Sequence, residues 1–102
     1  MHPIAAVQSE YSLWSRNAEV AVLDACKELG AAYVAFSPVG RGFLAGGVMD
    51  PSALAEKDIR NNMPRFHEPH FAKNLKLLEG FGAIAAEVGC TKAQLALAWL
   101  LA

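Results

Sequence analysis

The chain has 102 residues, with nine basic and ten acidic side chains and a formal net charge of −1. That length allows one domain at most, and the charge lacks the basic field that attracts nucleic acids or anionic lipids, so we expect neither as a partner. The hydrophobic fraction of 54% is high for so short a chain, which indicates that its apolar surface is covered in an assembly or in a larger structure.

The order of elements begins with a β-α-β pattern. Residues 4–9, "IAAVQS", predict a short buried strand, and residues 18–29 predict an amphipathic helix with Asn17 as its N-cap and Gly30 at its end. Residues 31–36, "AAYVAF", are almost continuously apolar, as parallel strands covered on both faces are. A strand, a helix and a second strand in this order predict a βαβ unit.

Residues 37–69 are rich in proline and glycine and are expected to be irregular, with one helical turn near 52–58. Residues 70–88 predict a second helix, which Gly89 ends, and Thr91 with Gln94 forms the capping box of a third helix. That helix carries "LALAWLLA", apolar on all sides, so we expect protein to enclose it. These elements leave strand edges and one sheet face open, as in a slice of a repeating β/α array.

Membrane and disulfide signals are weak. "LALAWLLA" is far shorter than the roughly 18 apolar residues of a membrane span, and "MHPIAAVQ" lacks the basic start of a signal peptide. We therefore expect a cytoplasmic protein. Cys26 and Cys90 fall in separate helical patterns, which favours two reduced packing thiols over a disulfide or a metal pair.

The stretch "YVAFSPVGRGFLAGG", residues 33–47, follows the second predicted strand with a glycine-rich loop. Gly40, Gly42 and Ala45 fit G-x-G-x-x-G/A, but that dinucleotide motif also requires a helix directly afterwards and an acidic residue after the next strand, whereas Asp58 lies in the irregular region. No Gly-Lys-Ser/Thr follows, which excludes a P-loop. An anion-binding loop assisted by Arg41 and a plain tight turn with a solvated arginine both stay open.

The stretch "RNNMPRFHEPH", residues 60–70, gathers four side chains that could face an anion or a metal: Arg60, Arg65, His67 and His70. Pro69 works against the helical turn that would align the two imidazoles, so solvated loop histidines are favoured over metal ligands. Trp14 and Trp99 are expected to be packing residues, although Trp14 lies close enough to a strand end to line a pocket. No nucleophile–base pair emerges from the spacing.

The stretches "HPIAAVQSEYSLWSR", "YVAFSPVGRGFLAGG", "IRNNMPRF" and "GCTKAQLALAWLLA" together resemble the aldo-keto reductase family over essentially the whole chain. The resemblance implies an α/β fold of the (β/α)₈ TIM-barrel type, here a partial barrel with a βα-βαα order and two parallel strands. A barrel of this type needs about 250 residues, so we expect residues 1–102 to be part of one domain, from strand six to the helix before strand eight.

The resemblance also implies the cofactor and the residues that contact it. NADPH would reduce aldehydes or ketones, with Gln8 on the nicotinamide carboxamide, Phe36 stacked on the nicotinamide ring where the family commonly has tyrosine, and the loop after Phe36 along the pyrophosphate. The loop residues are Ser37, Pro38, Val39, Gly40 and Arg41.

The family's catalytic Asp, Tyr, Lys and His belong to the first half of the barrel, and its Lys and Arg for the 2′-phosphate follow strand eight. We therefore expect no catalytic residue and no metal site here, and weak or absent cofactor binding by this chain alone. One alternative is a noncatalytic module that forms a homo-oligomer through exposed strand edges. Another is a small Rossmann-like binder.

Overall fold

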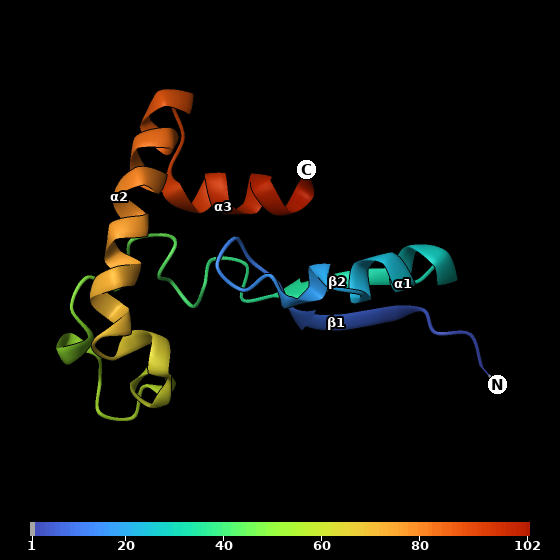
Figure 1. Ribbon diagram of the computed structural model, residues 1–102, viewed down its shortest axis with the longest axis horizontal. Helices are drawn as coiled ribbons and strands as arrows, with labels where there is room; N and C mark the ends of the chain where they lie inside the picture. Colours follow the sequence, from blue (N-terminus) through green and yellow to red (C-terminus); the bar gives the residue numbers. More distant parts are fainter. Residues whose placement is uncertain (1) are drawn as a thin grey trace.

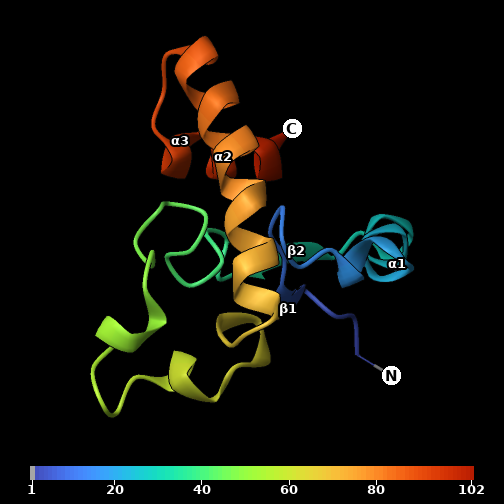
Figure 2. The same cartoon turned by 60° about the vertical axis from the view of Figure 1, so that its left-hand side comes forward.

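A computed structural model describes residues 2–102 (Figures 1 and 2). Strand β1 spans Ala6–Glu10, helix α1 spans Val22–Leu29 and strand β2 spans Ala32–Phe36. Helices α2, His70–Val88, and α3, Lys92–Leu101, complete the chain. Short 3₁₀ turns lie before α1 and in the segment between β2 and α2, at Asn17–Glu19, Pro51–Ala53, Ile59–Asn62 and Pro64–Phe66.

The two strands pair in parallel, which confirms the predicted βαβ unit. The register places Ala6 beside Ala32 and Glu10 beside Phe36. Helix α1 connects the strands and buries Cys26, and its C-cap Gly30 takes the left-handed conformation at φ 66°, as predicted. The predicted Asn17 cap is wrong, because Asn17 begins a 3₁₀ turn and α1 starts only at Val22, after Ala21.

One face of the sheet is open. Residues alternate along each strand, so that Gln8, Val34 and Phe36 share this face, and Val34 and Phe36 are 47% and 39% exposed. The open face agrees with the expectation that these elements leave one sheet face open, although the apolar run of the second strand, typical of strands covered on both faces, is covered on one face only within residues 2–102. Its apolar run has α1 on one side only, and the other side meets no described element that buries it.

The buried core lies away from the sheet, between the segment after β2 and helix α2. Phe43, Phe66, Phe71, Leu78 and Phe81 belong to this cluster, together with Leu44, Val48 and Ala96. The aromatic members meet edge-to-face or stacked, with ring centroids 6.0 Å apart for Phe43 and Phe71. The predicted helical turn at 52–58 is shorter and earlier, at Pro51–Ala53, where the Asp50 side chain accepts from the Ser52 backbone N–H.

The end of α2 and the start of α3 have the capping residues that the sequence predicted. Gly89 ends α2 at φ 80°, and Thr91 and Gln94 form the complete capping box. The prediction that protein encloses the third helix is wrong among the described residues, since only Ala96 of α3 is buried and Leu101 is 88% exposed. Leu97, Ala98 and Leu101 are exposed, whereas Leu95, Trp99 and Leu100 are half-buried, so protein covers the helix on one side only.

The molecule is extended for its length. Its radius of gyration is 15.7 Å, against roughly 13 Å for a compact domain of 100 residues. Figure 1 shows the β1–α1–β2 unit extending away from the upright helix α2, with the N-terminus at the far tip. Among residues 2–102 no single helix is long and apolar enough to cross a membrane, although α2 and α3, bent by 85°, meet that test as a pair.

Candidate functional site

The carboxyl ends of the two strands form one edge, and two of the predicted site residues share a face there. Parallel pairing places Gln8 beside Val34, and the next pair on the same face is Glu10 with Phe36. Gln8 is exposed, and Phe36 presents its ring at the last position of β2. Gln8 and Phe36 are thus diagonal neighbours on the same open face of the sheet.

The loop after β2 turns through a series of left-handed residues. The φ angles are 51° at Ser37, 60° at Gly40, 56° at Arg41 and 89° at Gly42. For Ser37 and Arg41, which carry a Cβ, this conformation costs roughly 1–2 kcal/mol each and persists only where the surroundings hold it. The loop continues in turns through Gly46 rather than entering a helix, which overturns the Rossmann alternative.

Gly40 is buried under an indole. A Cβ added to Gly40 would lie 2.9 Å from Cε3 of Trp14, and Trp14 in turn stacks on Phe43 with ring centroids 4.2 Å apart. The Arg65 guanidinium also lies over the Trp14 ring, with its central carbon 4.8 Å from the ring centroid. Trp14 is therefore a packing residue, as predicted, and it fixes the path of the loop at Gly40.

The backbone carbonyl of Arg41 is hydrogen-bonded, whereas the Nε of its side chain is not, among residues 2–102. Its carbonyl oxygen accepts a hydrogen bond from Nη1 of Arg60 at 3.1 Å. Its Nε is buried and has no hydrogen-bond partner among residues 2–102. Ser37, Pro38 and Val39 are half-buried, and Gly40 is buried.

The four side chains of the 60–70 stretch do not converge on one site. Arg60 pairs with Asp58, whereas Arg65 donates to Glu10 and to Ser15 Oγ, both at 3.0 Å. His67 and His70 are exposed, and among residues 2–102 no three potential metal ligands cluster. Both arginines of the stretch thus pair with carboxylates of the chain itself, Arg60 with Asp58 and Arg65 with Glu10 at the end of β1.

Two structural features of this region were not predicted from the sequence. Ser12 is fully buried, and its Oγ accepts from the backbone N–H groups of Trp14 and Ser15 at 3.1 and 2.9 Å, which shapes the turn that carries the indole. The Asp58–Arg60 pair is the other. A serine two residues before the tryptophan and an Asp-x-Arg triplet were the available signals.

Tyr11 has no free hydroxyl for proton transfer. Its hydroxyl donates to Glu19 at 2.8 Å, and desolvation together with this hydrogen bond raises the pKa of Tyr11 above its usual value. The Tyr33 hydroxyl donates to the Ser9 carbonyl at 3.3 Å. Both tyrosine hydroxyls therefore donate to acceptors within the chain.

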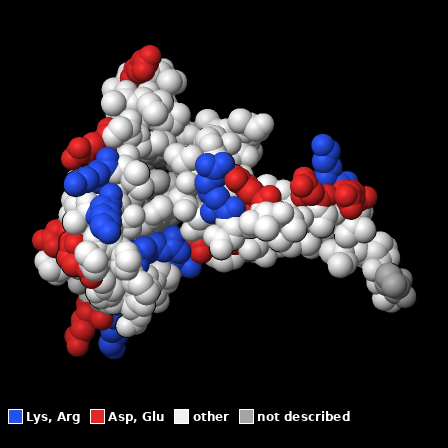
Figure 3. All heavy atoms as spheres, in the orientation of Figure 1, with Lys and Arg blue, Asp and Glu red and all other residues white. Residues whose placement is uncertain are grey.

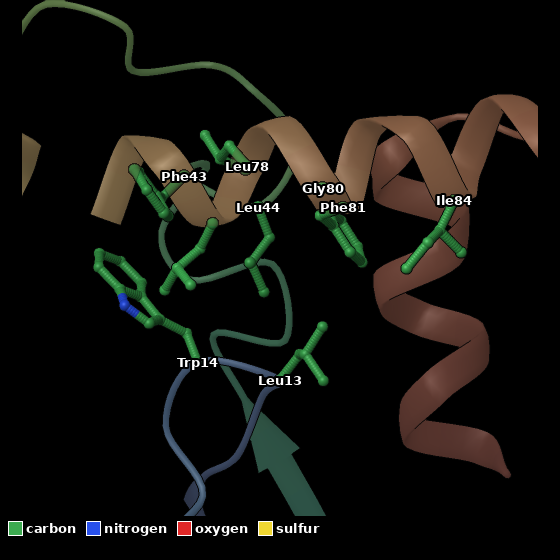
Figure 4. Close-up of a pocket in the computed structure, with 9 residues that line it drawn as sticks. Leu13, Trp14, Phe43, Leu44, Leu78, Gly80, Phe81 and Ile84 are labelled. Atoms are coloured by element: carbon green, nitrogen blue, oxygen red, sulfur yellow. The ribbon is translucent and has the colours of Figure 1, made fainter. Parts of the chain in front are cut away.

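Three hollows accompany these residues. Figure 4 shows the first, of about 360 Å³, where Leu13 and Trp14 face Leu78, Phe81 and other apolar side chains of α2. None of the predicted cofactor residues lines it. Pro38 lines the second hollow, of about 750 Å³, which lies between β2 and α3 beside Tyr33 and Trp99. The third, of about 210 Å³, is wholly apolar and lies against α1.

Charged side chains are spread over the surface. Figure 3 shows Lys and Arg interspersed with Asp and Glu on the visible face, with wide uncharged areas between them. The arrangement is consistent with the formal net charge of −1. Charge alone therefore marks no strongly basic or acidic binding surface on that face.

Comparison with known proteins places these features in a family context. Residues 1–102 match the family model described as the aldo/keto reductase family. The fold is similar to that of the glycerol dehydrogenase AKR11B4 from Gluconobacter oxydans, with a TM-score of 0.90 and 28% sequence identity. The similarity covers 98% of this chain and 31% of that chain, so this chain spans about a third of that enzyme's length. The two parallel strands and three helices thus correspond to part of a TIM barrel.

Proposed function

This chain belongs to the aldo/keto reductase family, and on that premise we propose that it supplies part of the dinucleotide site of an NADP-dependent reductase. The reaction is hydride transfer from NADPH to an aldehyde or ketone. The observation that supports this role is the open sheet face at the carboxyl end, where Gln8 and Phe36 lie together and the 37–41 loop follows directly. The carboxyl end of the strands is where TIM-barrel enzymes hold their ligands.

Each proposed contact matches the chemistry of one part of the cofactor. The Gln8 amide both donates and accepts, as the nicotinamide carboxamide does, and the Phe36 ring offers a flat apolar face for the nicotinamide. In the loop, Ser37, Pro38, Val39, Gly40 and Arg41 line the pyrophosphate. Small residues let backbone N–H groups come close to an anion, and Arg41 adds a planar cation.

Proton transfer falls to residues outside these 102. We assign no catalytic acid or base here, because the Tyr11 hydroxyl is engaged with Glu19 and the Tyr33 hydroxyl with the Ser9 carbonyl. The family tetrad of Asp, Tyr, Lys and His has no counterpart that we can place on this chain. The isolated chain is therefore expected to be inactive, and NADPH oxidation with an aromatic aldehyde above the blank rate would contradict the proposal.

The cofactor role is tested by affinity. Because the chain provides only part of the contacts, we expect weak NADPH binding, with a Kd on the order of 1 mM. Phe36→Ala removes the stacking partner and should weaken binding about three- to tenfold, whereas Phe36→Tyr should preserve it. Leu29→Ala is the control, since Leu29 is an exposed apolar residue at the far end of α1. Equal affinities for Phe36→Ala and Leu29→Ala would refute the stacking role.

Residues 1–102 are proposed to form one segment of a barrel domain that acts in the cytoplasm. Both cysteines are free thiols, which suits a reducing compartment.

Self-assembly is a second candidate function, favoured by the open sheet. The free edges of β1 and β2 and exposed residues such as Val34, Leu29 and Leu101 would be covered by a second copy of the chain. Light scattering at micromolar concentration should then give a dimer or a larger species. A monodisperse monomer would argue against this module and would leave the cofactor role to the titration.

A further inference from the structure

Two side chains of the 58–60 stretch hold the glycine-rich loop from outside, and the proposed function gives them no role. The Asp58 carboxylate accepts from Nε and from the backbone N–H of Arg60, both at 2.9 Å, and its other oxygen pairs with Nη2. The remaining nitrogen, Nη1, donates to the Arg41 carbonyl at 3.1 Å. One guanidinium therefore joins a carboxylate on one edge to the loop backbone on the other.

The carbonyl that Arg60 holds belongs to the residue that most needs support. Arg41 has a φ of 56° between Gly40 and Gly42, which also have positive φ angles. Glycine takes this conformation without strain, but arginine does not. A Cβ added to Gly42 would lie 3.5 Å from Nη1 of Arg60, which shows that the guanidinium also rests against the next residue of the loop.

The Asp58–Arg60 ion pair is largely shielded from solvent. Side-chain exposure is 25% for Arg60 and 18% for Asp58, against 53% and 33% for Arg16 and Glu19, the ion pair at the start of the chain's first helical turn. Solvent and salt weaken exposed pairs far more than shielded ones. The carboxylate also locks the guanidinium plane in two-point geometry, which fixes the direction of Nη1.

This arrangement argues against direct phosphate binding by Arg60. Nε and Nη2 are occupied by Asp58, and Nη1 is directed at the Arg41 carbonyl. The charge is moreover balanced by the adjacent carboxylate. An arginine that grips a phosphate presents two free parallel donors instead.

We propose that Arg60, held by Asp58, is a positioning residue that sets the left-handed conformation of residues 40–42 through the Arg41 carbonyl. The link from this loop conformation to pyrophosphate binding rests on the proposed function. The effect on the loop itself does not, so the two are separated by experiment.

The first experiment measures amide hydrogen exchange by NMR on the 102-residue chain. The reporters are loop amides whose bonds depend on this conformation: Phe43, Leu44 and Gly47 donate to the carbonyls of Gly40, Val39 and Gly42 at 3.1, 3.0 and 2.9 Å. Arg60→Gln and Asp58→Asn should each speed their exchange about tenfold, the effect of losing about one charge-assisted hydrogen bond. Arg16→Gln, which removes an equal charge from the exposed pair, should leave it unchanged.

Global unfolding is monitored at the end of α2. The Gly89 and Cys90 amides both donate to the Ala85 carbonyl at 3.0 Å, far from the loop in sequence. Their exchange should stay at the wild-type rate in all three variants. Loop exchange in Arg60→Gln equal to that in Arg16→Gln would overturn the proposal, and so would equal acceleration at the loop and at Gly89.

The second experiment titrates NADPH into the same variants. Arg60→Gln should weaken binding at least about fivefold, and Arg60→Lys should weaken it as much, because a point charge cannot reproduce the planar fork. If Arg60→Lys keeps both the wild-type affinity and the wild-type loop exchange, charge alone is sufficient and the positioning role is overturned. A wild-type chain without response to NADPH would refute the proposed function, while the exchange data would still decide the role of Arg60.

Discussion

Gly40→Ala is expected to destabilise the chain through two separable effects. Gly40 has a φ of 60°, which alanine adopts at a cost of roughly 1–2 kcal/mol. The new Cβ would also lie 2.9 Å from Trp14 Cε3 and 3.4 Å from Leu44 Cγ. Trp14 has little room to retreat, because it stacks on Phe43 at 4.2 Å and lies under Arg65. Overpacking of this kind costs typically about 1–3 kcal/mol.

The chain contains a matched control for the backbone effect. Gly30 has a nearly equal φ of 66°, but nothing lies within 4 Å of a Cβ added there. Gly30→Ala should therefore carry only the conformational cost, and both variants share the same gain from a less flexible unfolded chain, about 0.4–1 kcal/mol. The difference between them isolates the contact with Trp14.

Urea unfolding followed by tryptophan fluorescence measures both variants on one scale. We expect Gly40→Ala to lower the free energy of unfolding by about 1–3 kcal/mol more than Gly30→Ala does. Equal losses would refute the reasoning, since they would mean that the indole does not press on Gly40. A loss in Gly40→Ala that disappears when Trp14 is replaced by leucine would support it.

Three further changes are predicted. The Arg60 hydrogen bonds lower the pKa of Asp58 from 3.8 to about 2, so its stabilising effect is complete above pH 3.8 and is lost as the pH falls through about 2. Urea midpoints between pH 5 and pH 2 should show this loss in the wild type and a smaller one in Asp58→Asn, and parallel curves would contradict it. Gly80→Ala should stabilise the chain by about 0.5–1 kcal/mol in thermal melts, because Gly80 lies inside α2 with nothing within 4 Å of an added Cβ, and a lower Tm would disprove this. Thr91→Ala removes the hydroxyl that accepts from the Gln94 N–H at 3.1 Å and should cost about 0.5–2 kcal/mol in urea unfolding, whereas no change would show that the capping box is dispensable.

The elements that the sequence predicted well depend on contacts between near neighbours. Gly30 and Gly89 end their helices because the left-handed C-cap is a local demand. The capping box joins Thr91 to Gln94, three residues apart. The parallel βαβ unit follows from a helix of suitable length between two apolar strands.

The features that the sequence did not predict depend on long-range contacts. Arg60 reaches a carbonyl 19 residues earlier, and Arg65 reaches Glu10 across 55 residues. Hydrophobic periodicity does not predict the path of the irregular segment 37–69, so it does not predict which distant residues that segment contacts. The exposure of α3 was missed for a related reason, since an apolar helix predicts burial but does not say which residues cover it.

The candidate site divides in the same way. The loop and the strand end are visible in "YVAFSPVGRGFLAGG", and the resemblance supplied their proposed ligand. That Gln8 and Phe36 share a sheet face could be known only from the strand register. The contact between Gly40 and Trp14 could be known only from the three-dimensional fold. The contribution of Ser12 to the Trp14 turn depends on burial that no local pattern signals.

The central claim is that the carboxyl end of this sheet holds part of a dinucleotide, and a residue-resolved NMR titration with NADPH tests it most directly. The account predicts that the largest chemical-shift changes fall on the Gln8 side-chain amide and on the backbone amides of 36, 37 and 39–41, while α1 stays unchanged. Shift changes confined to the apolar hollow between Trp14 and Phe81, or none up to about ten times the expected millimolar Kd, would contradict it.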